Sequence, residues 1–246
     1  LFLRARPEGL VVVNTNGTLL TPENLAPFVP LAGQLLFVLS LDGLRLVHDG
    51  RRRLLSGESA FTAAVRGITL LGRPGIRVVC NMVLDRENGD GIGDFFAFLA
   101  GELGMHEVSV SLNNRPEGEF PVAEKVALLK TAYHAAARAG LALGGHHRLL
   151  LGHRIPELRC RAGEKTVLFT PDLRAFSCQR FVGRMAAATW SPGAPLAALV
   201  DGAAARACCG GPDTLALGNA LYEFYEQEYP QYLRINTLDR LLFGVL

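Results

Sequence analysis

Apolar and polar positions alternate in a regular rhythm along the first 140 residues of the chain. Four short runs rich in Val, Ile, Leu and Phe have the length and composition of buried strands: 9–15, 34–41, 75–84 and 106–112. Four further stretches carry apolar residues at helical spacing or helix start and stop signals: 21–30, 59–72, 93–104 and 122–140. This alternation with short connections predicts parallel strands joined by right-handed crossovers, in a barrel-like or doubly wound α/β sheet.

The rhythm breaks near residue 145. Residues 165–178 predict a small hairpin that turns at Pro171 and Asp172. An amphipathic stretch follows near the end of the chain, at 221–233. The sequence therefore predicts two domains: an α/β domain over 1–145 and a smaller C-terminal region with a terminal helix over 146–246.

Polar side chains collect where the predicted strands end. They are Thr15, Asn16 and Gly17 after the first strand, Ser40 and Asp42 after the second, Asn81 late in the third, and Asn113 and Asn114 after the fourth. Each of these residues is by itself an ordinary turn former. Because ligands of parallel α/β folds bind at the carboxyl ends of the strands, the whole set predicts a binding site at that edge.

Composition and charge narrow the class of protein. A hydrophobic content of 49% supports a sizeable core, and a net charge of +2 gives no sign of a nucleic-acid-binding surface. No apolar run reaches the roughly 20 residues of a membrane helix, and no signal-peptide pattern is present. We therefore expect a cytoplasmic protein with no nucleic-acid or membrane partner. The chain begins at Leu1 without an initiator Met, which predicts that it is part of a longer protein.

Four of the five cysteines lie in the last third of the chain. Cys80 is the exception, because it lies inside an apolar strand run and is predicted to be a buried core thiol. In a cytosolic chain the other four indicate metal or redox chemistry more than disulfides: Cys160, Cys178, Cys208 and Cys209. One iron–sulfur cluster, a zinc site, and free or disulfide-prone thiols all remain open.

Two groups of basic residues have simpler interpretations. His146, His147 and His153 have a spacing that could bind a metal, but we expect them to be exposed loop residues. Arg51 and Arg53, at the two ends of a run of three arginines, are expected to lie solvated on the surface.

Four quoted segments together resemble a known family. NTNGTLLTPENL, VLSLDGLRLVHDGRRR, SAFTAAVRGITLL and IRVVCNMVLDREN occur in this order. Their order and spacing resemble the radical SAM superfamily, in the branch with a C-terminal SPASM or twitch extension. The segment CRAGEKTVLFTPDLRAFSCQRFVG is similar to the first half of a SPASM-type region. The resemblance implies the C-terminal portion of a partial (β/α)6 barrel, followed by a small cysteine-containing extension.

The resemblance also implies cofactors and site residues. The cofactors are S-adenosylmethionine and a [4Fe–4S] cluster, which together yield a 5′-deoxyadenosyl radical that takes hydrogen from the substrate. Ser40 and Arg52 are placed at the methionyl carboxylate and ribose, a role that suits the planar fork of arginine. Asp42 is expected to cap the turn or orient Arg52, Leu112 to pack on the adenine, and His48 to fix the loop after the second strand. The residues carried over to the cofactor site are Thr15, Asn16, Ser40, Asp42, Arg52, Asn81 and Leu112.

The sequence departs from the family pattern in its cluster motifs. The Cys-x3-Cys-x2-Cys loop that ligates the radical-generating cluster is absent from these 246 residues, as is the Gly-Gly-Glu segment that receives the amino group of S-adenosylmethionine. Both are expected upstream, so loss of an N-terminal segment is the simplest explanation. The alternatives are a degenerate relative and one partner of a split enzyme. The four C-terminal cysteines match the thiolates of one auxiliary cluster, although adjacent Cys208 and Cys209 are an unusual pair for two of its corners.

Three functional hypotheses follow. The leading one is a radical SAM maturase of the SPASM type that crosslinks or oxidises a peptide or small protein, with a flavodoxin- or ferredoxin-type electron donor. The main alternative is a catalytically inactive scaffold of the same fold that binds a peptide or partner protein. The third is an ordinary α/β-barrel enzyme in which Ser-x-Asp-Gly is coincidental, and it predicts no binding of S-adenosylmethionine.

Overall fold

The computed structural model describes residues 9–113, 120–159, 168–170, 172, 174–176, 188–189 and 212–243. The chain divides into two compact units: Leu1–Arg148 together with Arg234–Leu246, and Leu149–Leu233. The domain division expected between residues 145 and 146 stays a prediction. The chain from Arg234 onward, however, groups with the first unit rather than with the second.

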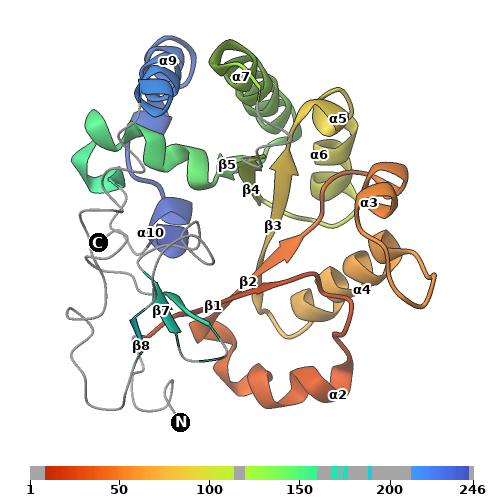
Figure 1. Ribbon diagram of the computed structural model, residues 1–246. Helices are drawn as coiled ribbons and strands as arrows, with labels where there is room; N and C mark the ends of the chain where they lie inside the picture. The colour runs from red at the N-terminus through yellow and green to blue at the C-terminus, as the bar shows by residue number, and fades with distance from the viewer. Residues whose placement is uncertain are drawn as a thin grey trace. The chain divides into compact units, whose positions relative to one another are not determined.

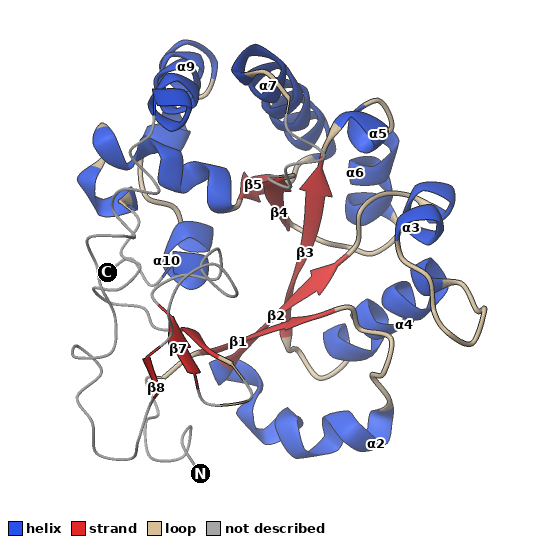
Figure 2. Ribbon diagram, viewed as in Figure 1, coloured by secondary structure: helices blue, strands red, loops and turns tan. Residues whose placement is uncertain are grey.

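The first unit is built on a sheet of five parallel strands, ordered as they occur along the chain (Figure 1 and Figure 2). The strands are β1 (Val11–Thr15), β2 (Leu35–Ser40), β3 (Arg77–Leu84), β4 (Glu107–Leu112) and β5 (Ala142–Gly144). The first four correspond to the four predicted runs, which confirms the parallel α/β class. β5 was not predicted, because its three residues Ala-Leu-Gly include no β-branched or aromatic side chain.

Helices connect the successive strands (Figure 1). They are α2 (Pro22–Leu25) with the 3-10 helix η1 (Ala26–Gln34), α3 (Arg45–Arg51), α4 (Ala60–Gly72), α5 (Arg86–Gly89), α6 (Ile92–Gly101) and α7 (Val122–Ala139). α4 begins where the sequence predicted, because the N–H of Thr62 donates to the Ser59 hydroxyl and the N–H of Phe61 donates to Asp49. α7 ends at Gly140, whose φ of 71° closes the helix in the left-handed region.

The two faces of the sheet have different partners. Side chains alternate along a strand, so the register places Leu36, Val38 and Val79 on one face, which we call the inner face. These three residues form a buried cluster with Leu238 of α10 (Thr237–Phe243). Figure 1 shows α10 on the opposite side of the sheet from α4 and α6. The part of the inner face formed by Leu36, Val38 and Val79 is therefore apolar and covered by α10.

A buried ion pair joins α10 to the rest of the first unit. The Nε of Arg148 donates to Oδ1 of Asp239 at 2.8 Å, and a terminal nitrogen donates to Oδ2 at 2.6 Å. A terminal nitrogen also donates to the backbone carbonyl of Arg234 at 3.0 Å. Both side chains of the pair are 0% exposed. Because separating the pair would leave an uncompensated charge in the interior, the pair fixes the position of α10.

His147 corrects one expectation from the sequence. It was expected to be an exposed loop residue, but it is buried within the 3-10 helix η3 (His146–His153). Its Nδ1 lies 3.0 Å from the Val110 carbonyl and must donate there, so its Nε2 accepts from the Tyr133 hydroxyl at 2.8 Å. His146 and His153 are exposed, as expected.

The free energy of unfolding should depend on His147 at mildly acidic pH. Burial lowers its pKa from 6.5 to about 4, so between these values the unfolded chain binds a proton that the folded chain does not. Its contribution to stability is complete above pH 6.5 and is lost as the pH falls towards 4. Going from pH 7 to pH 5 should remove about 2 kcal/mol through this group.

Urea unfolding of His147→Gln at both pH values checks this prediction. Glutamine can keep both hydrogen bonds but does not titrate, so the variant should lose less stability than the wild type on acidification. His146→Gln, at the exposed neighbour, is the matched control. Equal pH slopes for His147→Gln and the wild type would contradict the prediction.

The chain after β2 also differs from expectation, because it forms α3 rather than a loop. The N–H of Arg52 donates to the carbonyl of His48 at 2.8 Å and closes the last turn of the helix. A helix of seven residues is marginal by itself. Its stability therefore comes from the tertiary contacts of His48, Arg51 and Arg52 described below.

The second unit contains a small antiparallel sheet and a group of helices. Its elements are η4 (Pro156–Leu158), β6 (Leu168–Phe169), β7 (Arg174–Phe176), β8 (Ala188–Thr189), α9 (Pro212–Glu228) and the 3-10 helix η7 (Pro230–Leu233). β6 and β7 pair antiparallel, which confirms the predicted hairpin. α9 and η7 share an aromatic cluster: Phe224, Tyr225, Tyr229 and Tyr232. Over the described parts of both units, the helices are too short or too polar to cross a membrane.

Candidate functional site

The candidate site lies at the carboxyl ends of β2, β3 and β4, where the inner face becomes polar. Ser40 is the last residue of β2, and its register partner on β3 is Asn81. Ser109 of β4 pairs with Asn81 in turn. These three polar side chains form one row across the sheet, directly beyond the apolar part that α10 covers.

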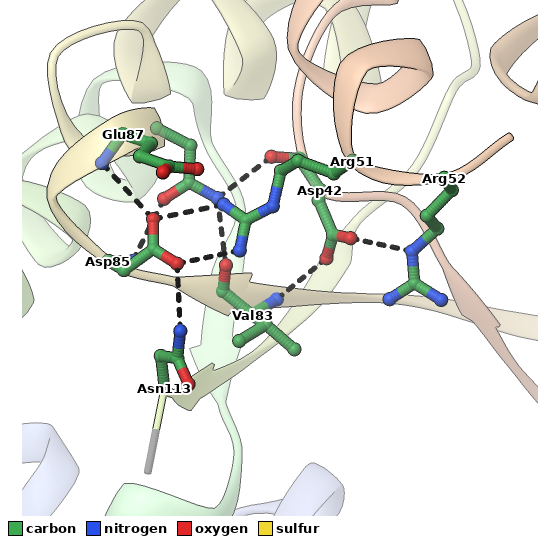
Figure 3. Close-up of polar contacts among 8 residues, drawn as sticks. Asp42, Arg51, Arg52, Val83, Asp85, Glu87 and Asn113 are labelled. Atoms are coloured by element: carbon green, nitrogen blue, oxygen red, sulfur yellow. Dashed lines mark hydrogen bonds and ion pairs between the residues drawn. The ribbon is translucent and has the colours of Figure 1, made fainter. Parts of the chain in front are cut away.

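Asp42 and Arg52 form an ion pair at the edge of this polar face. The Nε of Arg52 donates to Oδ2 of Asp42 at 2.6 Å, and the N–H of Val83 donates to Oδ1 at 2.9 Å. The Asp42 side chain is 4% exposed and that of Arg52 is 35% exposed. Figure 3 shows the two terminal nitrogens of Arg52 directed away from Asp42, and neither has a partner among the described residues. This contact is the one that an Asp42 orienting Arg52 would make, and the role of Asp42 in a cofactor site stays a prediction.

The backbone of Asp42 is also fixed. Its N–H donates to Nδ1 of His48 at 3.1 Å, and its carbonyl accepts from Nδ2 of Asn88 at 2.9 Å. His48 is 1% exposed, and burial lowers its pKa, so the ring is neutral and Nδ1 is free to accept. The expectation that His48 fixes the chain after the second strand is confirmed.

Arg51 forms a second ion pair, with Asp85, next to the first (Figure 3). Two nitrogens of Arg51 donate to the two carboxylate oxygens at 3.0 and 2.6 Å, and Nδ2 of Asn113 donates to Oδ2 at 3.1 Å. Burial alone would raise the pKa of Asp85, but these hydrogen bonds outweigh it and hold the pKa below its usual value. The expectation that Arg51 is a solvated surface residue is wrong, whereas Arg53 is exposed as expected.

The two adjacent arginines therefore make different contacts. Arg51 ties the end of α3 to the ends of β3 and β4 through Asp85 and Asn113. Arg52 is tied to Asp42 through one nitrogen only. A guanidinium held in this way keeps two donors in a fixed plane, which is the geometry that binds a carboxylate or phosphate in a forked manner.

Thr15 and Asn16 are engaged in the turn after β1. The N–H of Gly17 donates to the Thr15 hydroxyl at 3.0 Å, and the N–H of Thr18 donates to the Asn16 side chain at 3.2 Å. Gly17 has a φ of 74°, and a Cβ there would lie 2.6 Å from Leu39, so the turn requires glycine. Roles of Thr15 and Asn16 in cofactor binding stay predictions.

Leu112 lies apart from the polar row. It is the register partner of Leu84 and alternates with Ser111, so its side chain is on the face opposite the inner face. It is 8% exposed. Its predicted contact with adenine stays a prediction.

Sequence reasoning missed Ser109 and Ser111. Both hydroxyls donate to Oδ1 of Asn81, at 2.9 and 3.3 Å. The available signal was the alternation Val-Ser-Val-Ser-Leu in β4, because polar residues two apart on a buried strand share one face.

The four C-terminal cysteines, Cys160, Cys178, Cys208 and Cys209, lie outside the described residues, as does Asn114. Within the described residues no group of three His, Cys, Asp or Glu side chains could hold a metal ion. Cys80 is 0% exposed, and burial raises the pKa of its thiol, which confirms it as a core residue.

An open depression of about 930 Å³ lies at the other edge of the sheet, at the amino ends of β3 and β4. Arg77 and Glu107 form an exposed ion pair within its lining. None of the predicted site residues belongs to it. The carboxyl edge of the sheet remains the candidate site.

No protein-family model and no curated protein matches the chain. Solved structures do match it. The structure of native anSMEcpe with bound AdoMet and Kp18Cys peptide superposes with a TM-score of 0.66 at 13% identity, over 91% of this chain and 75% of that one. Streptococcus suis SuiB bound to S-adenosylmethionine gives 0.60 at 14% identity, over 92% of this chain and 58% of SuiB. SuiB bound to its precursor peptide SuiA gives 0.52 at 14% identity, over 70% and 43%.

At identities this low, the superpositions establish a shared fold alone. The partial barrel expected from the resemblance to the SPASM-type radical SAM proteins is confirmed over nine tenths of the chain. The chain spans a little over half of SuiB and three quarters of anSMEcpe.

Proposed function

We propose that this chain binds S-adenosylmethionine at the carboxyl edge of β2, β3 and β4, as part of a radical SAM protein that modifies a peptide or small protein. The observation that carries the proposal is the Asp42–Arg52 pair, which holds at that edge two guanidinium nitrogens that have no partner in the part of the chain that the structure describes. The structures of the same fold support it, because anSMEcpe is bound to AdoMet and a peptide, and SuiB is seen with S-adenosylmethionine and with SuiA.

The residues at the edge fit the polar groups of S-adenosylmethionine. Arg52 would donate its two terminal nitrogens to the methionyl carboxylate, and the buried charge of Asp42 keeps the guanidinium in place. Ser40, at the end of β2, would add a hydroxyl on the inner face beside Asn81. Arg51 and Asp85 would keep the end of α3 fixed while the ligand binds.

A [4Fe–4S] cluster supplies the one-electron chemistry of this superfamily. The 246 residues contain no Cys-x3-Cys-x2-Cys segment, so the residues present do not fit that cluster. An auxiliary cluster at Cys160, Cys178, Cys208 and Cys209 and a flavodoxin- or ferredoxin-type electron donor belong to the proposal for the whole protein. A crosslink or an oxidation as the product, and a cytoplasmic location, belong to the same proposal.

The catalytically inactive scaffold stays the alternative function. A scaffold of the same fold that binds a peptide without modifying it needs no cluster and need not bind S-adenosylmethionine. The two candidates differ in one measurable property, which is affinity for S-adenosylmethionine in the absence of any peptide.

Calorimetric titration of the protein with S-adenosylmethionine tests the proposal. We expect saturable binding that Ser40→Ala weakens roughly 3- to 10-fold, as for the loss of one hydrogen bond to a ligand. Ser56→Ala, at an exposed serine in the loop before α4, is the matched control and should leave affinity unchanged. Absence of saturable binding by the wild type, with peptide binding retained, would establish the scaffold instead.

A further inference from the structure

The carboxamide of Asn81 is held in one orientation by two serines. Its Oδ1 accepts from the hydroxyls of Ser109 at 2.9 Å and Ser111 at 3.3 Å. A carbonyl oxygen has two lone pairs, so both acceptor positions are filled. Nδ2, with two N–H donors, is then on the far side of the carboxamide from these hydroxyls. Within the described part of the chain Nδ2 has no hydrogen-bond partner.

The position of this donor relates it to the candidate site. Asn81 is half-buried on the inner face, between its register partners Ser40 and Ser109. Two residues further along β3 is Val83, whose N–H donates to Asp42, the partner of Arg52. Along a strand two residues span roughly 7 Å. Asn81 therefore lies on the inner face, two residues before the edge of the sheet at which Arg52 is held.

We infer that Ser109 and Ser111 are positioning residues that fix Asn81 as a hydrogen-bond donor to an oxygen atom of bound S-adenosylmethionine. The inference rests on the proposed function. A ligand that covers a half-buried NH2 group displaces its water, so that group must then find an acceptor. S-adenosylmethionine offers acceptors in its carboxylate and its ribose hydroxyls. Because the serines hold the carboxamide before binding, little side-chain freedom is lost when the ligand arrives.

Substitutions of Asn81 test the donor. Asn81→Asp keeps an acceptor oxygen for the serines but replaces the donor by an anionic oxygen, so it should weaken S-adenosylmethionine binding more than Asn81→Ala does. Titration with 5′-methylthioadenosine, which lacks the methionyl carboxylate, locates the contact. A loss with both ligands places it at the ribose, and a loss with S-adenosylmethionine alone places it at the carboxylate. Unchanged affinity for both ligands in both variants would overturn the inference.

A double-mutant cycle tests the role of the serines. Combined Ser109→Ala and Ser111→Ala should weaken binding roughly 3- to 10-fold in the wild type and have no further effect in the Asn81→Ala background. Ser109→Thr combined with Ser111→Thr keeps both hydroxyls and should retain the affinity for S-adenosylmethionine. Ser56→Ala, at an exposed serine, is the control. The melting temperature of each variant is followed in parallel.

The outcomes of the cycle separate the inference from the proposed function. Equal losses in both backgrounds would mean that the serines do not act through Asn81, and the inference would be wrong. In that case the proposed function would still stand if the wild type binds S-adenosylmethionine and the binding depends on Arg52. A wild type without S-adenosylmethionine binding would overturn both.

Discussion

Replacing Asp239 by alanine is expected to destabilise the first unit by about 3–5 kcal/mol, because it leaves a buried guanidinium without its carboxylate. Arg148 and Asp239 are both 0% exposed, so water cannot replace the lost partner. Asp239 also accepts from the N–H of Asn236 at 3.1 Å and thereby caps the start of α10. The same change should therefore loosen α10 from the inner face.

Urea unfolding of the variant and of two controls checks this expectation. Arg240→Ala removes an exposed charge of the same helix and should stay within about 0.5 kcal/mol of the wild type. Arg148→Met combined with Asp239→Leu replaces both charges by apolar groups and should recover most of the lost stability. An Asp239→Ala variant within about 1 kcal/mol of the wild type would show that the pair does not anchor α10.

Replacing Arg52 by alanine is expected to weaken binding of S-adenosylmethionine roughly 10- to 100-fold. Charge-assisted hydrogen bonds contribute about 1.5–3 kcal/mol, and each 1.4 kcal/mol is a factor of ten in affinity. Arg52→Lys should give an intermediate loss, because an ammonium cannot keep the contact with Asp42 and still present two donors in a plane.

Arg53→Ala is the matched control, because Arg53 is the exposed neighbour of Arg52 on the same chain segment. Binding is measured by calorimetry, and melting is followed alongside because Asp42 loses a partner in the Arg52 variants. An Arg53→Ala variant that loses as much affinity as Arg52→Ala would point to the general positive charge of the segment and away from a specific contact.

Local patterns in the sequence predicted most of the strands and helices of the first unit. Strand runs, helix starts such as Ser59 and the polar strand ends are readable because their determinants lie within a few residues of one another. The interpretation of His48 and Asp42 came instead from the resemblance to a known family, and the two residues, six apart, bond directly.

The contacts that shape the site are not local. Arg51 and Asp85 are 34 residues apart, Asp42 and Val83 are 41 apart, and Arg148 and Asp239 are 91 apart. No periodicity along the chain reports such pairings, which is why α3 was expected to be a loop and Arg51 to be solvated. These long-range contacts become visible only in the folded chain, where the register of the sheet brings the segments together.

Gly144 illustrates the same limit. Its place in a short Ala-Leu-Gly segment gave no indication of a strand, yet it lies on the inner face against α10. A Cβ at this position would lie 2.5 Å from Leu238. Glycine is present because a helix distant in the sequence packs directly on the backbone.

Recognition of the ligand carboxylate by Arg52 is the central claim, and one calorimetric comparison tests it directly. S-adenosylmethionine and decarboxylated S-adenosylmethionine are titrated into the wild type and into Arg52→Ala. We expect the wild type to prefer the ligand with the carboxylate roughly 10- to 100-fold, and Arg52→Ala to lose that preference. Equal affinity of the wild type for both ligands, or the same preference in both proteins, would contradict the claim.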